Sequence, residues 1–182
     1  MQFLGKPHSF GNLVDGVQDA VGLGQFAQWV LKNFDPTLTW KDVAWIRDRW
    51  DGPIVIKGVL DAADAKEAVA TGANGILVSN HGGRQLDGVQ SGAAAFPAIA
   101  DAVGGQTTLL LDGGIRSGLD VLRALALGAD GAFIGRAWAY ALAARGQKGV
   151  TQALQILRAE LVTAMSLTGC TDVRKAGREL LA

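Results

Sequence analysis

One pattern occurs twice in this chain, as PIVIKGVLDAADAKEAVATGANGILVSN at residues 53–80 and as TTLLLDGGIRSGLDVLRALALGADGAFIGR at residues 107–136. Each copy begins with a short β-prone run, turns at glycine and continues into an alanine-rich helical stretch. Each then reaches Gly-Ala-Asn/Asp-Gly before a second apolar run. Continuous apolar runs separated by helices indicate strands of a parallel sheet that is buried on both faces. The repeat therefore predicts an α/β fold.

Outward from the repeat, the same reasoning predicts alternating strands and helices. The expected strands are residues 54–57, 75–79, 108–111 and 132–134, and the helices between them are residues 62–71, 93–103 and 118–127. Upstream, Thr39 can cap a helix that runs to Trp50. Downstream, an apolar stripe at helical spacing predicts a last helix that ends near Gly169. The stripe consists of Val150, Leu154, Leu157, Leu161 and Ala164.

This order of elements fits either a doubly wound sheet or a (β/α)8 TIM barrel. Polar residues follow every predicted strand. The active site of a TIM barrel lies at the face formed by the carboxyl ends of its strands, and phosphate is commonly held there after strands 7 and 8. The clusters at residues 112–116 and 135–136 have the content of such a phosphate site. We therefore expect the C-terminal half of a TIM barrel, strands 5–8 with their helices. Strands 1–4 must come from elsewhere, because a whole barrel needs about 250 residues and this chain has 182.

Composition narrows the possible partners. Seventeen basic and seventeen acidic residues cancel, so no overall field favours nucleic acid. The single cysteine, Cys170, cannot form an internal disulfide, which fits a reducing compartment. No apolar run approaches the roughly 20 residues that cross a bilayer, and no Cys/His cluster indicates a metal site.

The segment SNHGGRQLDG, residues 79–88, contains the strongest candidates for chemistry. His81 can exchange a proton near neutral pH. Arg84 can bind a carboxylate through two parallel hydrogen bonds, and the glycines between them allow the backbone close to a bound ring. Either residue alone would more readily be a hydrogen-bonded loop histidine or a surface arginine. Their combination at a strand end favours function.

Two further features suit an anionic cofactor. Lys57 ends an apolar run, so its ammonium group must meet an anion, enter the pocket or extend to solvent. The Asp112-Gly113-Gly114-Ile115-Arg116 turn offers backbone donors, a cation and the start of a helix, which together form an anion site. Gly135 and Arg136 can close that site from the other side.

These motifs follow one another as they do in the FMN-dependent α-hydroxy-acid dehydrogenases and oxidases. The chain resembles that family along almost its whole length, and within it most closely the bacterial enzymes that oxidise L-lactate. The resemblance implies FMN as cofactor, an L-2-hydroxy acid as substrate and an external electron acceptor. It makes His81 the catalytic base and Arg84 the substrate-carboxylate ligand. It places Lys57 and Ser79 at the flavin ring, and it puts the following residues around the ribityl phosphate: Asp112, Gly113, Gly114, Ile115, Arg116, Gly135 and Arg136.

The resemblance also implies what this chain does not carry. The family's N-terminal half supplies strands 1–4, a tyrosine near the substrate and an aspartate paired with the catalytic histidine. We therefore expect this chain alone to be inactive and to need that half or self-association, with a homo-oligomer at full length. Residues 1–35 correspond to the connection after strand 4, a membrane or subunit contact, and residues 36–182 to the half-barrel. We expect a cytoplasmic location, with peripheral attachment to the inner face of the cytoplasmic membrane left open.

Two other functions compete with this interpretation. Another phosphate-binding barrel oxidoreductase, such as a relative of IMP dehydrogenase, would share the GGIR-like turn. That family needs a catalytic cysteine loop, whereas Cys170 lies in the terminal helical region. The second alternative is a noncatalytic half-barrel fragment or self-associating scaffold. Flavin absorbance that L-lactate bleaches would distinguish an enzyme from a scaffold.

Overall fold

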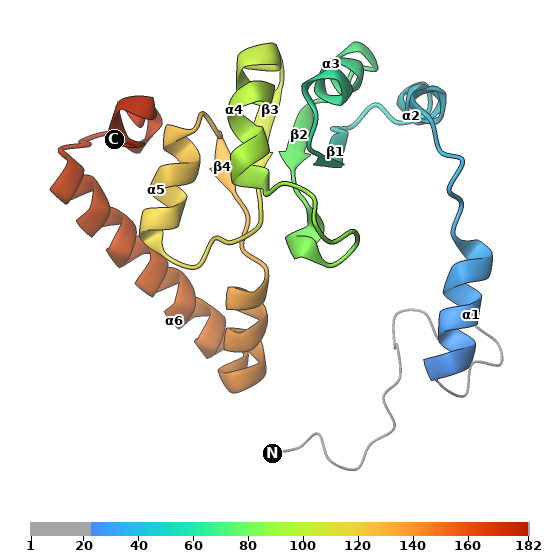
Figure 1. Cartoon of the computed structure of the whole chain (residues 1–182). Helices are drawn as coiled ribbons and strands as arrows, with labels where there is room; N and C mark the ends of the chain where they lie inside the picture. The colour runs from blue at the N-terminus through green and yellow to red at the C-terminus, as the bar shows by residue number, and fades with distance from the viewer. Residues whose placement is uncertain (1–22, 182) are drawn as a thin grey trace. The chain divides into compact units, whose positions relative to one another are not determined.

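A computed structural model of the chain describes residues 23–181 (Figure 1). The chain divides into two compact units, residues 1–39 and residues 40–182. The described part of the first unit contains helix α1 (Leu23–Asn33), with Leu31 and Phe34 exposed. Residues 1–22 of the segment that we expect to contact a membrane or a subunit lie outside the described residues. Within residues 23–181, no helix is both long and apolar enough to cross a membrane.

The second unit has the alternating order that the repeat predicts, which confirms the α/β fold. Its strands and main helices, in chain order, are α2 (Trp40–Arg47), β1 (Val55–Val59), α3 (Ala62–Ala70), β2 (Gly75–Val78), α4 (Gly92–Val103), β3 (Thr108–Leu111), α5 (Gly118–Ala126), β4 (Gly131–Ala132) and α6 (Arg136–Thr168). Among residues 40–181 the structure also shows three short 3₁₀ helices: η2 (His81–Gly83), η3 (Val173–Lys175) and η4 (Arg178–Leu181).

The four strands form one parallel sheet in the order β1-β2-β3-β4. Each strand is hydrogen-bonded to its sequence neighbour, so the described sheet contains no reversal of strand order. A doubly wound sheet needs such a reversal. Helices α3, α4 and α5 pack against the strands they connect, as crossover helices between adjacent parallel strands do.

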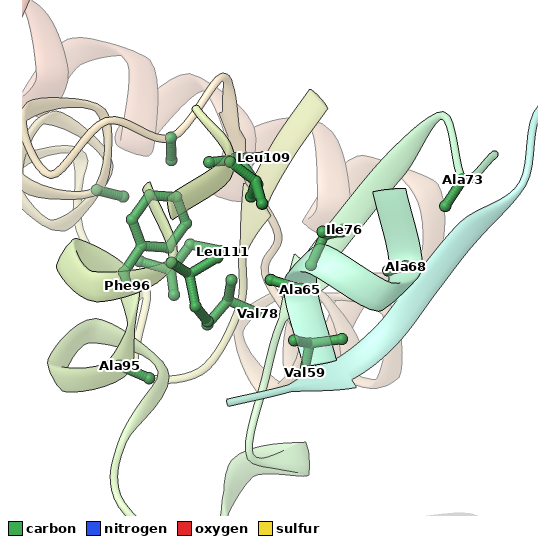
Figure 2. Close-up of a cluster of buried hydrophobic side chains, with 14 of the residues drawn as sticks. Val59, Ala65, Ala68, Ala73, Ile76, Val78, Ala95, Phe96, Leu109 and Leu111 are labelled. Atoms are coloured by element: carbon green, nitrogen blue, oxygen red, sulfur yellow. The ribbon is translucent and has the colours of Figure 1, made fainter. Parts of the chain in front are cut away.

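The hydrophobic core lies between the sheet and these helices (Figure 2). Ile76 and Val78 of β2 and Leu109 and Leu111 of β3 point into it, together with Phe96 of α4. Because side chains alternate along a strand, the residues between them face the opposite side of the sheet.

Several boundaries differ from the sequence-based expectation. The α2 helix ends at Arg47 instead of Trp50, because the Arg47 guanidinium donates to the carbonyls of Trp50 and Gly52 beyond the helix. The last strand is residues 131–132, not 132–134; its two residues pair with Leu110 and Leu111, where β3 ends.

The final helix, α6, also differs from expectation in one respect. It ends at a left-handed Gly169, as predicted. Its backbone is kinked at Arg145 and Gly146. Leu154 of the predicted packing stripe is 52% exposed, whereas Ala164 is buried. The stripe therefore packs mainly through its C-terminal part.

Candidate active site

Lys57, Ser79 and Asp112 meet at the carboxyl ends of three adjacent strands. The Lys57 Nζ donates to Ser79 Oγ at 3.0 Å and lies 3.3 Å from Asp112 Oδ2. Ser79 is fully buried, and the Lys57 side chain is 44% exposed. The lysine therefore has the anionic partner that its apolar strand requires, and part of its side chain remains exposed to solvent.

Asp112 keeps one oxygen without a partner. Its Oδ1 is buried and accepts no hydrogen bond from the described residues. A buried carboxylate oxygen without a donor costs free energy. This oxygen therefore marks a place where a hydroxyl group of a ligand would be stabilised.

His81 begins a sharp turn directly after Ser79 and Asn80. Its backbone amide donates to Ser79 Oγ at 3.0 Å, and the Gly82 amide donates to Asn80 Oδ1 at 3.0 Å. His81 has a φ of 57°, a left-handed conformation that only glycine among the other described residues adopts. Side chains rarely tolerate that conformation, and such strain concentrates at functional sites. The Asn80 side chain, which our sequence analysis did not single out, holds this turn.

Arg84 follows the same turn, and both Arg84 and His81 are exposed. Asp87 accepts from the Gly88 amide at 2.9 Å. Within residues 23–181, no carboxylate lies at ion-pair distance from Arg84. Asp87 could orient Arg84 or bind within its own turn, and the structure shows the second arrangement. The Arg84 guanidinium is therefore available to an external carboxylate.

The glycine turn after β3 exposes main-chain donors. Gly113 and Gly114 have φ values of 90° and 83°, and no atom lies within 4 Å of a Cβ placed on Gly114. Ile115 is buried and belongs to the hydrophobic core, so only its backbone can face a ligand. Consecutive glycines in this conformation form a concave site that suits an anion.

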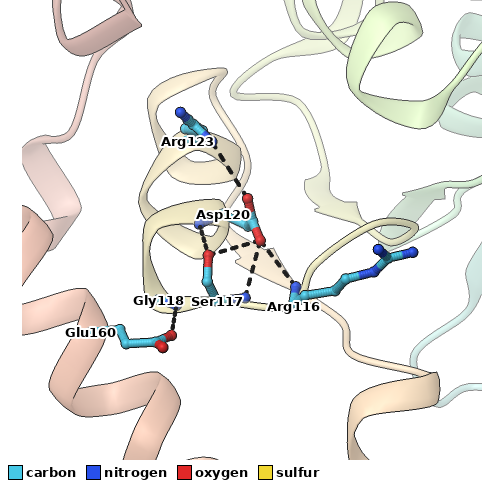
Figure 3. A network of polar contacts seen from close by, with 6 residues as sticks. All are labelled: Arg116, Ser117, Gly118, Asp120, Arg123 and Glu160. Atoms are coloured by element: carbon cyan, nitrogen blue, oxygen red, sulfur yellow. Dashed lines mark hydrogen bonds and ion pairs between the residues drawn. The ribbon is translucent and has the colours of Figure 1, made fainter.

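The start of α5 does not contribute the donors that the sequence predicted, which corrects that expectation (Figure 3). The Asp120 amide binds Ser117 Oγ, and the Gly118 amide binds Glu160 Oε2 of α6 at 2.8 Å. The Asp120 carboxylate in turn accepts from the backbone amides of Arg116 and Ser117. These protein groups already occupy the Gly118 and Asp120 amides of the helix. The Arg116 side chain extends away from this network.

The same network shifts the ionisation of Asp120. Partial burial raises the pKa of the Asp120 carboxyl group. Hydrogen bonds from Ser117 and the Arg116 amide, and the charge of Arg123, lower it by more. The pKa of Asp120 therefore lies below its ordinary value of 3.8.

The start of α6 is the uncapped helix end near the site. Gly135 is its N-cap and forms no side-chain cap hydrogen bond. No atom lies within 4 Å of a Cβ placed on Gly135. The Arg136 Nη2 is 3.9 Å from the Cβ position of Gly82, so the arginine reaches the histidine turn. An uncapped helix N-terminus with an adjacent arginine favours an anion.

A model of the family described as FMN-dependent dehydrogenase matches residues 2–182. The chain belongs to this family.

Curated and solved members of the FMN-dependent dehydrogenase family agree with that assignment. L-lactate dehydrogenase of Caulobacter vibrioides is 59% identical over 98% of this chain and 47% of the relative. The enzyme of the same name from Acinetobacter baylyi is 56% identical over 93% of this chain and 44% of the relative. A crystal structure of mandelate oxidase superposes with a TM-score of 0.76 at 51% identity, over 80% of this chain and 44% of that one. The chain thus spans about half the length of the curated relatives it matches.

Proposed function

We propose that this chain is the second half of an FMN-dependent enzyme that oxidises an L-2-hydroxy acid to a 2-oxo acid, with L-lactate as the expected substrate. One observation carries the proposal: four residues meet at the carboxyl end of the sheet, namely Lys57, Ser79, His81 and Asp112. The lactate dehydrogenase relatives and the mandelate oxidase neighbours support this substrate class.

The residues present fit FMN. The buried Asp112 Oδ1 lacks a donor, which a hydroxyl group of the ribityl chain would supply. Ser79 Oγ already accepts two hydrogen bonds, so its hydroxyl proton is available for an acceptor on the flavin ring. The backbones of Gly113, Gly114 and Ile115, with Gly135 and the two guanidinium groups of Arg116 and Arg136, would hold the phosphate.

The bound flavin would accept the two electrons that the substrate loses. The Lys57 ammonium group would stabilise negative charge on the flavin ring in the reduced state. Arg84 would bind and orient the substrate carboxylate through its two parallel donors. The His81 imidazole would accept the proton released by the substrate. An external electron acceptor would complete the cycle.

We further propose that strands β1–β4 are strands 5–8 of a TIM barrel. The sequential strand order and the parallel pairing support this proposal. In the described sheet β1 and β4 pair on one side only, and Val55 of β1 and Phe133 directly after β4 are about half exposed. Open edges of this kind need to be covered. Strands 1–4, in the same polypeptide or in another, would cover them, and self-association is the alternative.

The remaining assignments are proposals of the same kind. Residues 1–35 would form the connection after strand 4, and residues 36–182 the half-barrel. The assembled enzyme would be a cytoplasmic homo-oligomer. The connection would either attach it peripherally to the inner face of the cytoplasmic membrane or contact another subunit. Flotation with liposomes, with and without residues 1–35, tests the attachment.

Anaerobic flavin reduction tests the proposed function. The holoenzyme, meaning this chain with strands 1–4 and FMN, should show flavin absorbance with one FMN per protomer. L-lactate should bleach that absorbance, and D-lactate should not. A protein that binds no FMN, or FMN that L-lactate leaves oxidised, would support the noncatalytic scaffold. This chain alone should show no turnover, and stoichiometric FMN with L-lactate turnover would disprove that expectation.

A further inference from the structure

Gly58 lies against the imidazole of His81. A Cβ placed on Gly58 would be 2.8 Å from His81 Cε1 and 3.5 Å from Nε2. The first distance is shorter than two carbon atoms tolerate without displacement, since carbon contacts are optimal at about 3.5–4.0 Å. The ring therefore occupies space that any side chain at position 58 would take.

Gly58 is also the irregular residue of its strand. Ile56 pairs with Ile76 and Lys57 with Leu77, but Val78 pairs with Val59, so Gly58 is the extra residue of a β-bulge. Because side chains alternate along a strand, an uninterrupted strand would place Val59 on the same face as Lys57. With the bulge, Val59 is 5% exposed in the hydrophobic core, while Lys57 reaches Ser79. Bulges beside active sites commonly redirect a side chain in this way.

The His81 backbone is fixed from the other side. Its amide is bound to Ser79 Oγ, and its φ of 57° is held by the Asn80 turn. Within residues 23–181, no hydrogen bond to the imidazole itself is formed. In the described residues, the imidazole ring of His81 therefore packs closely against the main chain at Gly58.

We propose that Gly58 is a positioning residue for His81. The absence of a Cβ and the φ of 101° at the bulge let the imidazole lie against β1, beside the strand end that carries Lys57. The role rests on the proposed function, because it concerns the same histidine. It assigns to the glycine of the PIVIKG segment a task separate from holding the flavin.

Substitution by alanine in the holoenzyme tests the role. Gly58→Ala should lower kcat for L-lactate about 10–100-fold, since displacement of a catalytic group by about 1 Å costs up to 10²-fold. KM and the FMN content should stay close to those of the parent. Gly105→Ala is the matched control: Gly105 also has a positive φ, 77°, but no atom lies within 4 Å of its Cβ position. Gly105 follows α4, away from the site, and the kcat of Gly105→Ala should match that of the parent enzyme.

A His81→Ala background separates positioning from general damage. There, Gly58→Ala should change the remaining kcat by less than about twofold, because the two effects are not independent. Gly58→Ala should also lower Tm less than it does in the parent, since the ring it would displace is absent. Independent effects on both kcat and Tm, or loss of FMN from Gly58→Ala, would overturn the inference. A parent that fails to oxidise L-lactate would refute the proposed function, and the Tm comparison would still decide whether Gly58 and His81 interact.

Discussion

The two copies of the repeat share a structural device at one end and differ at the other. In the first copy, Asn74 accepts from the Ile54 amide through its side chain and donates to the Ile54 carbonyl through its own amide. In the second copy, Asp130 makes the same pair of hydrogen bonds with Leu109. The Asn/Asp of each Gly-Ala-Asn/Asp-Gly motif thus fixes the beginning of the preceding strand.

At the carboxyl ends of the strands the copies have different chemistry. The first copy carries Lys57 and Ser79, and His81 follows it directly; these side chains can hold or move a proton. The second carries a glycine turn, an uncapped helix start and Arg116 and Arg136, which can hold an anion. Stability and chemistry are therefore placed at opposite ends of the same strands, as in TIM barrels generally. One scaffold can then be repeated while its reactive ends diverge.

The largest expected effect concerns His81, directly after the first copy. His81→Ala in the holoenzyme should lower kcat for L-lactate by about 10²–10⁴-fold, because it removes the proton acceptor. Steady-state kinetics measure the loss, and flavin absorbance shows whether the cofactor stays bound. An activity within a few-fold of the parent would mean that another group accepts the proton.

The next effect belongs to the second copy. Arg136→Ala should weaken FMN binding by about 10–100-fold, since a hydrogen bond to a charged group contributes about 1.5–3 kcal/mol. Titration of the apoprotein with FMN gives the Kd. Arg123→Ala is the control, because this exposed arginine pairs with Asp120 instead of facing the glycine turn. Equal losses in the two variants would contradict the assignment of the phosphate to the start of α6.

The repeat was sufficient to predict much of this fold. Apolar runs and glycine positions gave the four strands and the helices between them to within about two residues, because burial on both faces leaves a strong local pattern. The bulge at Gly58 was not predicted. Its cause is a pairing between β1 and β2, and no local pattern reports which residue of a strand is skipped.

In the candidate site, too, local patterns were predictable from the sequence, whereas contacts between distant residues were not. The SNHGGRQLDG and DGGIR segments indicated the chemistry because their unusual residue combinations are contiguous. The α5 helix start was misassigned, because Glu160 reaches the Gly118 amide from α6, far along the chain. The Lys57–Asp112 pair likewise joins two strands that are distant in sequence. Contacts of this kind depend on the folded sheet.

A smaller effect tests whether the scaffold is shared. Asn74→Ala and Asp130→Ala should each lower the free energy of unfolding by about 1–3 kcal/mol, because each leaves a strand amide without its acceptor. Thermal unfolding of the holoenzyme measures the change. Asn74→Asp and Asp130→Asn keep an acceptor oxygen and should retain most of the stability. A large loss in one copy alone would show that the clamps are not equivalent.

The smallest expected effect concerns Asp120, in the second copy only. Its folded pKa is lowered, so its carboxylate stabilises the folded state above the unfolded pKa of about 4, and this stabilisation is lost as the pH falls through the folded value. Asp120→Asn should therefore cost about 1 kcal/mol near neutral pH, and less as the pH falls below about 4. Asp101→Asn is the control, because its ion pair with Arg178 is exposed and should contribute about 0–1 kcal/mol. If the cost of Asp120→Asn stays constant with pH, the capping network of α5 owes its stability to packing and not to the charge of Asp120.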